Sequence, residues 1–208
     1  MSNQTMHVEQ DKSNLVLASA SPRRVELLKQ IGITPIVCPV DIDETPMTGE
    51  LVTGLVARLA REKAQQGALE TDGKHPVIGS DTVGLLDGKV LLKPIDYADA
   101  ESMLLAMSNR WHEIHTSVAL VHKAQCHQVT AISRVKFKTL SRTEIKNYWR
   151  TGEPQDKAGA YAVQGLAAVF IERIEGSYSG IMGLPLFETA QLIREAGLPC
   201  INLMSDEL

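Results

Sequence analysis

Two long neighbouring segments, Trp111–His122 and His127–Lys138, carry the residue pattern of β-strands and constrain the fold more than any other part of the chain. Successive side chains of a strand point to opposite faces, so residues two apart share a face. On the second segment, one face would carry Val129, Ala131, Ser133, Val135 and Phe137, and the other Arg134, Lys136 and Lys138. The two segments therefore predict a pair of long antiparallel strands.

Helical segments alternate with strand-like segments along the chain. The best delimited helix covers residues 22–31, because Ser21 suits the N-cap, Pro22 the first helical position and Gly32 the C-terminal stop. Further helices are expected over 51–67, 97–107, 142–152 and 185–196, and further strands over 15–18, 34–40, 75–86, 89–92 and 166–174. This alternation, with several antiparallel pairs, predicts a mixed α/β fold.

Turn and cap residues support three of these boundaries. Asp87-Gly88 favours a tight hairpin turn between two strands, because glycine accepts a positive φ. Asp96 suits the N-cap of the helix that follows it, and Ser141 with Glu144 three residues later matches a capping box.

Length and composition predict a single domain. A chain of 208 residues can bury one substantial core, whereas two domains would each be small. Hydrophobic residues make up 44% and charged residues 22%, as in ordinary globular proteins, and with only 4% aromatic residues the core must be mostly aliphatic. The polar residues 1–13 are expected to form a flexible extension, and residues 14–208 one domain.

Charge, cysteine spacing and hydropathy argue against several classes of protein. A net charge of -4 disfavours general nucleic-acid binding, which usually requires a basic surplus. Cys38, Cys126 and Cys200 are widely spaced and form no CxxC pair, which disfavours structural zinc and a disulfide framework. Residues 1–14 lack the apolar core of a signal peptide, and no later run approaches the roughly 18 apolar residues of a membrane span. We therefore expect a cytoplasmic protein that does not bind a membrane.

Two arginines, Arg23 and Arg24, stand in the first turn of the expected helix 22–31, where the helix dipole already supplies positive charge. The arrangement is favourable if an anion binds there, because helix-start N–H groups and guanidinium groups both donate to phosphate. Two alternatives are that the arginines are merely solvated, or that Ser-Pro-Arg-Arg contacts a DNA minor groove, which the acidic net charge disfavours.

Acidic residues at two places are candidates for metal or proton chemistry. Asp81 follows an apolar run, where a carboxylate can bind a divalent metal or accept a proton from water, and the alternative is a capping residue. The loop "DIDETP" offers Asp41, Asp43 and Glu44, enough oxygen ligands for Mg²⁺ together with waters and phosphates. The alternative there is a solvated acidic turn.

The glycine-rich segment "GEPQDKAGAYAVQG", residues 152–165, combines backbone freedom with Lys157, which can bind phosphate, and Gln164, whose amide can read a base edge. A simple connector is the alternative. His112 and His115 would face opposite sides of a strand, which disfavours a shared metal. The chain shows no Walker lysine pattern, GxGxxG fingerprint or nucleophile elbow, so its acidic and basic candidates indicate a metal-bound polyphosphate as ligand.

Seven short motifs occur in order along the chain: "SASPRR", "DIDE", "REKA", "SDTV", "LLKP", "GEPQDKAGAYAVQG" and "GSYSGIMGLPL". Together they resemble the Maf family of nucleoside triphosphate pyrophosphatases over about residues 15–203. The loop "DKAGAYAVQG" resembles the branch that acts on dTTP and UTP rather than the branch that acts on 7-methyl-GTP. The resemblance implies an elongated mixed sheet flanked by helices, with two lobes around a central cleft as in ITPase-like folds. Homodimers are common in the family, so a homodimer is expected.

The resemblance also implies an activity, which is hydrolysis between the α and β phosphates of a nucleoside triphosphate with a divalent cation, Mg²⁺ or Mn²⁺. Such enzymes are thought to remove non-standard or surplus nucleotides. Asp81 would accept the proton and, with Glu44, would hold the metal. The residues expected to govern substrate choice are Arg23, Thr82 and Gln164. Those expected to hold the phosphates are Arg24, Lys63, Lys93 and Lys157, and Ser21 is expected to bind substrate beside them.

Three positions depart from the usual motifs of the family. Ser80 stands where alanine is common, Leu92 where glycine is commoner, and Asn109 where glycine usually follows serine. None of these changes removes a charged group, so the activity is expected to persist. Two alternatives remain, a non-enzymatic regulator of septum formation that binds nucleotides and a branch variant acting on 7-methyl-GTP. Retention of the full charged set favours catalysis.

Overall fold

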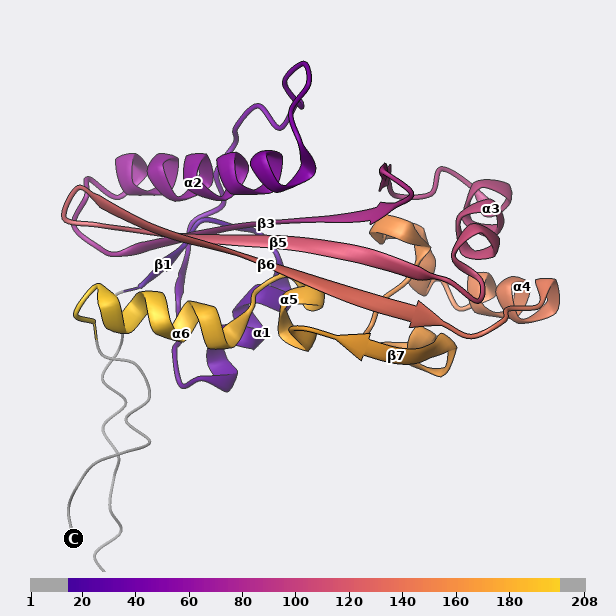
Figure 1. Ribbon diagram of the computed structural model, residues 1–208. Coiled ribbons are helices and arrows are strands. Elements are labelled where there is room, and N and C mark those ends of the chain that lie inside the picture. Colours follow the sequence, from indigo (N-terminus) through magenta and orange to yellow (C-terminus); the bar gives the residue numbers. More distant parts are fainter. Residues whose placement is uncertain (1–14, 199–208) are drawn as a thin grey trace, which may run out of the picture.

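A computed structural model describes residues 15–198, which form a seven-stranded mixed sheet flanked by helices (Figure 1). The strands are β1 (Val16–Leu17), β2 (Ile36–Val37), β3 (Val77–Leu86), β4 (Lys89–Leu91), β5 (Trp111–His122), β6 (Gln125–Phe137) and β7 (Ile171–Glu175). Their order is β2-β1-β3-β5-β6-β7, with β4 paired to β3 outside this path. β1 pairs in parallel with β2 and β3, and the other pairs are antiparallel. The expected mixed α/β fold is confirmed.

The long hairpin of β5 and β6 runs through the whole molecule, as the sequence pattern predicts. Its register extends from Trp111 opposite Lys136 to His122 opposite Gln125. Along β6, Ser133, Val135 and Phe137 are buried, while the intervening Arg134 is exposed. The alternation expected for this strand is therefore confirmed over residues 132–137, whereas Val129 and Ala131 on the expected inner face are only partly buried.

Six α-helices and three 3₁₀ helices accompany the sheet in the described residues. They are α1 (Pro22–Gln30), α2 (Val52–Glu70), α3 (Tyr97–Met107), α4 (Arg142–Arg150), η1 (Glu153–Asp156), η2 (Ala158–Ala160), η3 (Leu166–Phe170), α5 (Tyr178–Met182) and α6 (Leu186–Glu195). Figure 1 shows α2 over one face of the sheet, α1 and α6 over the other, and α3 and α4 at the far end of the long strands.

Two large apolar cores divide the molecule into two lobes that share β3, β5 and β6. One core packs α1 and α6 against the sheet around Leu28, Ile78 and Leu184. The other lies around Phe137 and Ile145, where α3, α4 and the 3₁₀ segments meet the sheet. This arrangement matches the expected elongated sheet with two lobes.

Local signals in the sequence place several boundaries correctly. Asp87 and Gly88 both have positive φ, 50° and 76°, in the turn between β3 and β4. The side chain of Asp96 accepts a hydrogen bond of 2.8 Å from the backbone N–H of the third residue after it. Ser141 and Glu144 form the expected capping box at the start of α4.

Other expectations are wrong in part. The strand expected over 34–40 contains only two paired residues, Ile36–Val37, both exposed. The strand expected over 166–174 begins as η3, because the Glu153 carboxylate accepts hydrogen bonds from the backbone N–H groups of Leu166 and Ala167 and thereby caps a helical turn. Ser21 occupies the N-cap position of α1, but its side chain makes no capping hydrogen bond. The short helix α5 was not expected.

Close packing between α2 and β3 depends on Gly79. A Cβ atom there would lie 2.3 Å from the carbonyl oxygen of Ala60 and 2.5 Å from the backbone nitrogen of Ala64. Ala60 and Ala64 are themselves fully buried against the sheet. Small residues on both elements let the helix backbone rest directly on the strand, so that side chains flanking the contact meet at short range.

The described helices include none that is long and apolar enough to cross a membrane. The extension expected over 1–13 lies outside the described residues, as does the end of the domain expected over 14–208. Cys38 and Cys126 are free thiols, and Cys200 lies outside the described residues.

Candidate active site

A gap in the edge of the sheet opens beside the middle of β3. On one side β3 pairs with β5 along nearly its whole length, and on the other side β1 pairs only with Val77–Ile78 and β4 only with Gly84–Leu86. Gly79–Val83 therefore face no strand at that edge among the described residues. Asp81 and Thr82 lie in this gap and point to opposite faces, because side chains alternate along a strand. A ligand at this edge can reach both side chains.

A pocket of about 260 Å³ lies on the face of β3 that carries Thr82. Its walls come from the start of α1, the segment 156–164, the end of α5 and the glycine that follows it, Gly183. Seven of the predicted site residues line it: Ser21, Arg23, Arg24, Thr82, Lys93, Lys157 and Gln164. The structure thus brings together motifs that are far apart in the sequence.

Arg24 is held firmly at the wall of this pocket. Its Nε donates to the carbonyl oxygen of Gly183 at 2.9 Å, and Nη1 donates to the hydroxyl of Ser19 at 3.0 Å. Nη2 lies at 3.5 Å from the hydroxyl of Thr82. A guanidinium group has five N–H donors, so two remain for a ligand after these three contacts among the described residues.

Two buried hydroxyls fix the surroundings of Arg24 and Thr82. The hydroxyl of Thr116 donates to the Gly180 carbonyl oxygen at 2.8 Å and lies 3.0 Å from that of Thr82. The hydroxyl of Ser80 lies 2.8 Å from the Ser117 carbonyl oxygen and 2.9 Å from that of Gly183. The serine that departs from the family pattern thus contacts the same carbonyl that holds Arg24.

On the opposite face of β3, Lys63 joins two carboxylates. Its Nζ lies 2.7 Å from Oδ1 of Asp81 and 2.7 Å from Oε1 of Glu44. The side chains of Lys63 and Asp81 are each 11% exposed, whereas that of Glu44 is 60% exposed. The lysine therefore fixes a nearly buried carboxylate and draws an exposed one toward it.

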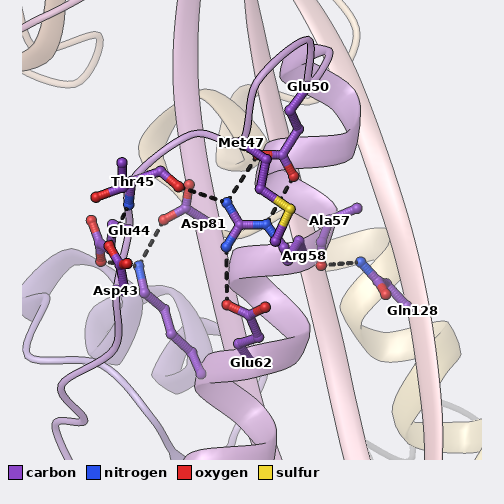
Figure 2. Close-up of polar contacts among 11 residues, drawn as sticks. Asp43, Glu44, Thr45, Met47, Glu50, Ala57, Arg58, Glu62, Asp81 and Gln128 are labelled. Atoms are coloured by element: carbon purple, nitrogen blue, oxygen red, sulfur yellow. Dashed lines mark hydrogen bonds and ion pairs between the residues drawn. The ribbon is translucent and has the colours of Figure 1, made fainter.

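Arg58 of α2 anchors the loop that carries Glu44 (Figure 2). Its guanidinium makes two hydrogen bonds, of 2.8 and 2.9 Å, to the carboxylate of Glu50 and one of 3.1 Å to the carbonyl oxygen of Thr45. A further bond of 3.1 Å reaches Glu62. Hydrogen bonding to Arg58 lowers the pKa of Glu50 to about 2, so this anchor is fully charged at neutral pH. Thr45 directly follows Glu44, and its fixed carbonyl limits where the Glu44 carboxylate can go.

Arg24 links the pocket to the charged group around Lys63. Burial lowers the pKa of Arg24, the negative charges of Asp81 and Glu44 oppose this change, and the neighbouring Arg23 adds to it. An arginine remains charged in proteins despite such effects. The carboxylates on one face of β3 and the arginines on the other therefore act within one electrostatic environment.

Lys157 and Arg23 share an acidic neighbour at the rim of the pocket. Lys157 forms an ion pair with Asp156, and hydrogen bonding to Lys157 is the main cause that lowers the pKa of this carboxyl, with a smaller contribution from Arg23. Asp156 also lines the pocket. Its negative charge offsets that of Lys157 and, more weakly, that of Arg23, and it would compete with a polyanionic ligand for these cations.

Tyr161 forms part of the pocket wall and is fixed from behind by His112. The hydroxyl of Tyr161 lies 2.7 Å from Nε2 of His112, and both rings pack edge-to-face with Phe137. Burial lowers the pKa of His112 to about 4 and raises that of Tyr161, so both groups are neutral at pH 7. His115 instead contacts Glu113 at 2.9 Å, so the two histidines have separate partners.

Glu44 and Asp81 are the two carboxylates placed to bind a divalent cation at this site. No group of three or more histidine, cysteine or acidic side chains suited to a metal occurs within residues 15–198. Glu44 and Asp81 converge on one Lys63 ammonium, and two carboxylates complemented by substrate phosphates and water satisfy the usual requirements of Mg²⁺. These residues therefore fit a cation that binds together with its phosphate ligand. Asp41 and Asp43 are not part of the Lys63 contact, and Asp43 instead accepts a hydrogen bond from the N–H of Thr45.

Sequence reasoning missed several residues of the site. Arg58 stands at an ordinary position in a charged helix, and Gly183 contributes only a carbonyl, so neither carries a local signal. Tyr161 and Asp156 lie within the glycine-rich segment 152–165, and their polar side chains are the signal that could have marked them as candidate site residues.

Comparison with known proteins gives consistent relatives. Residues 14–196 match the family described as Maf-like protein. A protein of Methylobacillus flagellatus named dTTP/UTP pyrophosphatase is 50% identical over 187 residues, covering 89% of this chain and 94% of that protein. A protein of Hahella chejuensis with the same name is 48% identical over 190 residues, covering 90% and 94%.

Among solved structures, the nucleoside-triphosphatase / dITP/XTP pyrophosphatase of Mycobacterium abscessus matches 60% of this chain and 74% of its own. The TM-score is 0.42 and the sequence identity 19%. The match to the Maf-like description spans nearly all the described residues and agrees with the curated relatives, and the chain belongs to the Maf family.

Proposed function

We propose that this chain is a nucleoside triphosphate pyrophosphatase that converts dTTP and UTP to the monophosphate and pyrophosphate. One observation carries the proposal: Asp81 and Thr82, adjacent on β3, reach Lys63 on one face and Arg24 in the pocket on the other. A triphosphate crossing the free edge of β3 would meet a proton acceptor and several cations together. The names of relatives at 50% and 48% identity support the same activity.

Asp81 is the proposed proton acceptor. It would take a proton from the attacking water as the water oxygen bonds to the α phosphorus. The bridging P–O bond then breaks, and pyrophosphate leaves with the electron pair. Lys63 holds the Asp81 carboxylate in place at 2.7 Å. A carboxylate held in this way does not have to reorient before it meets the attacking water, and such positioning lowers the barrier.

The phosphates are proposed to lie among Arg24, Lys63, Lys93 and Lys157. The half-buried guanidinium of Arg24 retains N–H donors beyond its contacts with Gly183, Ser19 and Thr82, and charge-assisted bonds to phosphate are among the strongest available. A divalent cation, Mg²⁺ or Mn²⁺, held by Glu44 and Asp81 with phosphate oxygens would neutralise part of the phosphate charge.

The nucleoside is proposed to occupy the pocket, where Arg23, Thr82 and Gln164 govern substrate choice and Ser21 contributes to binding. Gln164 offers both a donor and an acceptor, which match an N–H and a neighbouring carbonyl of uracil or thymine. Cytosine presents an acceptor in place of that N–H. A polar group left unpaired between the bound base and Gln164 costs about 1–3 kcal/mol where the base shields it from water, enough to separate UTP from CTP.

The proposal places the reaction in the cytoplasm, since its substrates are intracellular nucleotides, and requires neither nucleic acid nor a membrane. Arg24 is turned into the protein and donates to Gly183 and Ser19, which supports a role in nucleotide binding over a contact with DNA. The homodimer expected from the family stays a prediction.

The test is a panel of UTP, dTTP, CTP, GTP and 7-methyl-GTP, each assayed with Mg²⁺, Mn²⁺ and excess chelator. We expect UTP and dTTP to be the best substrates, with pyrophosphate and monophosphate released in equal amounts and no turnover with chelator. Release of orthophosphate would contradict cleavage between the α and β phosphates. A preference for 7-methyl-GTP would assign the chain to the other branch, and nucleotide binding without turnover would favour the septum regulator.

A further inference from the structure

A tyrosine and a glutamate behind the pocket form a pair that no part of the proposed chemistry uses. Tyr148 lies on α4 and is 4% exposed. Its hydroxyl donates to Oε1 of Glu153, at the start of η1, at 2.7 Å. Burial and then this hydrogen bond raise the pKa of Tyr148, so the hydroxyl keeps its proton and remains the donor at any pH of interest.

Tyr148 and Glu153 form hydrogen bonds with the backbone on both sides of Gln164. The backbone N–H of Ala162 points to the Tyr148 hydroxyl at 3.3 Å. On the other side, the carboxylate of Glu153 accepts from the N–H of Leu166 at 2.9 Å and from that of Ala167 at 3.3 Å. One hydrogen-bonded unit therefore fixes residues two before and two after Gln164.

The absence of a side chain at Gly165 leaves room for the Glu153 carboxylate to reach this backbone. A Cβ atom at this position would lie 2.3 to 2.5 Å from the carboxylate atoms of Glu153. Its N–H also donates to the Ala162 carbonyl oxygen at 3.1 Å, which closes a tight turn around Gln164. The backbone of this turn is therefore set by its hydrogen bonds to Tyr148 and Glu153 and by its own internal bond.

Gln164 itself is exposed and lines the pocket, so packing does little to fix its side chain. An amide that distinguishes two bases must be placed to within about 0.5 Å. Because few contacts within the protein hold this side chain, the fixed backbone around it decides where the side chain begins and which part of the pocket the amide can reach.

We propose that Tyr148 and Glu153 are positioning residues for Gln164 and thereby set the discrimination between uracil or thymine and cytosine. The inference rests on the proposed function, because it takes Gln164 as the residue that reads the base. It predicts that loss of the Tyr148–Glu153 bond changes the ratio of kcat/KM for UTP to that for CTP, as well as overall activity. A purely structural brace would lower both values together.

The experiment is a double-mutant cycle read as the UTP/CTP ratio of kcat/KM. Tyr148→Phe removes the hydroxyl and keeps the ring, so we expect the ratio to fall about tenfold, which is the loss when a misplaced Gln164 amide no longer makes one ordinary hydrogen bond to uracil. In the Gln164→Ala background, the same substitution should change the ratio by no more than about twofold, because the amide that Tyr148 is proposed to position is absent. Glu153→Gln tests the other member of the pair and should lower the ratio in the same direction.

Tyr97→Phe is the matched control. Tyr97 donates to Oε1 of Glu101 at 2.8 Å in the same lobe, and it does not line the pocket, so its removal should leave the ratio unchanged. If Gln164→Ala changes the ratio but neither Tyr148→Phe nor Glu153→Gln does, the positioning inference is overturned and the proposed function stands. If Gln164→Ala leaves the ratio unchanged, the proposed role of Gln164 fails and the inference fails with it. Should Tyr148→Phe not fold, Glu153→Gln alone decides between these outcomes.

Discussion

Lys63 on α2 lies 2.7 Å from Asp81 on β3, across the point where the helix backbone rests on Gly79. The same ammonium lies 2.7 Å from Glu44 on the preceding loop. Three consecutive segments, the loop after β2, α2 and β3, therefore meet in one charged group beside the free edge of β3. The chemistry proposed for Asp81 depends on this contact, because it fixes the carboxylate where a ligand can approach.

Asp81→Asn should abolish most turnover while preserving the fold. The amide keeps the size of the side chain but cannot accept the proton, and removal of a general base typically lowers kcat by about 10²–10⁴-fold. Release of pyrophosphate from UTP measures the effect, and circular dichroism checks the fold. Asp87→Asn is a suitable control, since Asp87 pairs with Arg110 in the hairpin turn. A folded Asp81→Asn protein with near-normal kcat would remove Asp81 from the role of base.

Arg24→Ala should weaken binding of the triphosphate more than binding of the monophosphate. The monophosphate lacks the β and γ oxygens that the cations are proposed to hold, and a lost charge-assisted hydrogen bond is worth about ten- to a hundredfold in affinity. Calorimetry with UMP and with a non-hydrolysable UTP analogue measures both affinities. Arg142→Ala is the control, because this arginine is 71% exposed and pairs with Glu101. Equal weakening would restrict Arg24 to the α phosphate or the base, and no weakening would mean that it does not bind the ligand.

Much of the fold could be predicted because its signals are local. Asp87-Gly88, Asp96 and the box of Ser141 with Glu144 act within a few residues of themselves, and all three behave as expected. The start of η3 could not be found in this way. Glu153 caps it from 13 residues away in the sequence, and an apolar run such as 166–170 by itself has the composition of a strand.

In the site too, some residues have local sequence signals and others depend on contacts between distant segments. The residues proposed to bind the ligand belong to recognisable motifs, and seven of them line one pocket. The residues that fix the site in place carry no signal in the sequence. Arg58 looks like any other charged residue of a helix, and Gly183 acts through its backbone carbonyl. Pairings between distant segments require the fold, and single residue types carry no signal for them.

Gly79→Ala should destabilise the protein and disturb the contact between Lys63 and Asp81. The new methyl group would overlap backbone atoms of Ala60 and Ala64, which cannot move as a flexible side chain can, and overpacking typically costs about 1–3 kcal/mol. Urea unfolding measures the loss, and kcat should fall at temperatures where the variant is folded. Gly54→Ala is the control, because Gly54 lies on α2, the helix that carries Ala60 and Ala64. A Cβ atom at Gly54 would meet only Cγ of Glu50 at 3.7 Å, so this substitution should be neutral or stabilising. Equal stability of the two variants would contradict the proposed close contact.

Arg58→Lys should loosen the loop that carries Glu44 without unfolding the protein. A lysine keeps the charge but cannot bind both oxygens of Glu50 and the Thr45 carbonyl in one plane. Hydrogen exchange of residues 43–50 should therefore become faster, and the Mn²⁺ concentration for half-maximal activity should rise. The control is Arg142→Lys at an exposed ion pair. Unchanged exchange in the Arg58 variant would show that the loop is held by other contacts.

His112 should make the free energy of unfolding depend on pH between about 4 and 6.5. Burial lowers the pKa of His112 from 6.5 to about 4, so in this range the unfolded chain binds a proton that the folded protein does not. The free energy of unfolding therefore falls as the pH drops through this window, by up to about 3 kcal/mol, and the loss levels off once the folded imidazole is also protonated. Above pH 6.5 both states are neutral at this residue and its contribution is constant.

His112→Gln removes this titration while its amide can still meet the Tyr161 hydroxyl, so the slope of unfolding free energy against pH should become shallower between 4 and 6.5. Urea unfolding at several pH values gives both slopes.

Tyr161→Phe is the control, because it deletes the hydrogen bond of 2.7 Å but keeps His112 buried, and burial is the cause of the lowered pKa. This control should retain the wild-type slope. Carboxyl groups with lowered pKa values, such as Glu50 and Glu144 at about 2, act chiefly below pH 4.5 in all three proteins and cancel in the comparison. Identical slopes for the wild type and His112→Gln would show that the folded imidazole gains its proton as readily as the unfolded one.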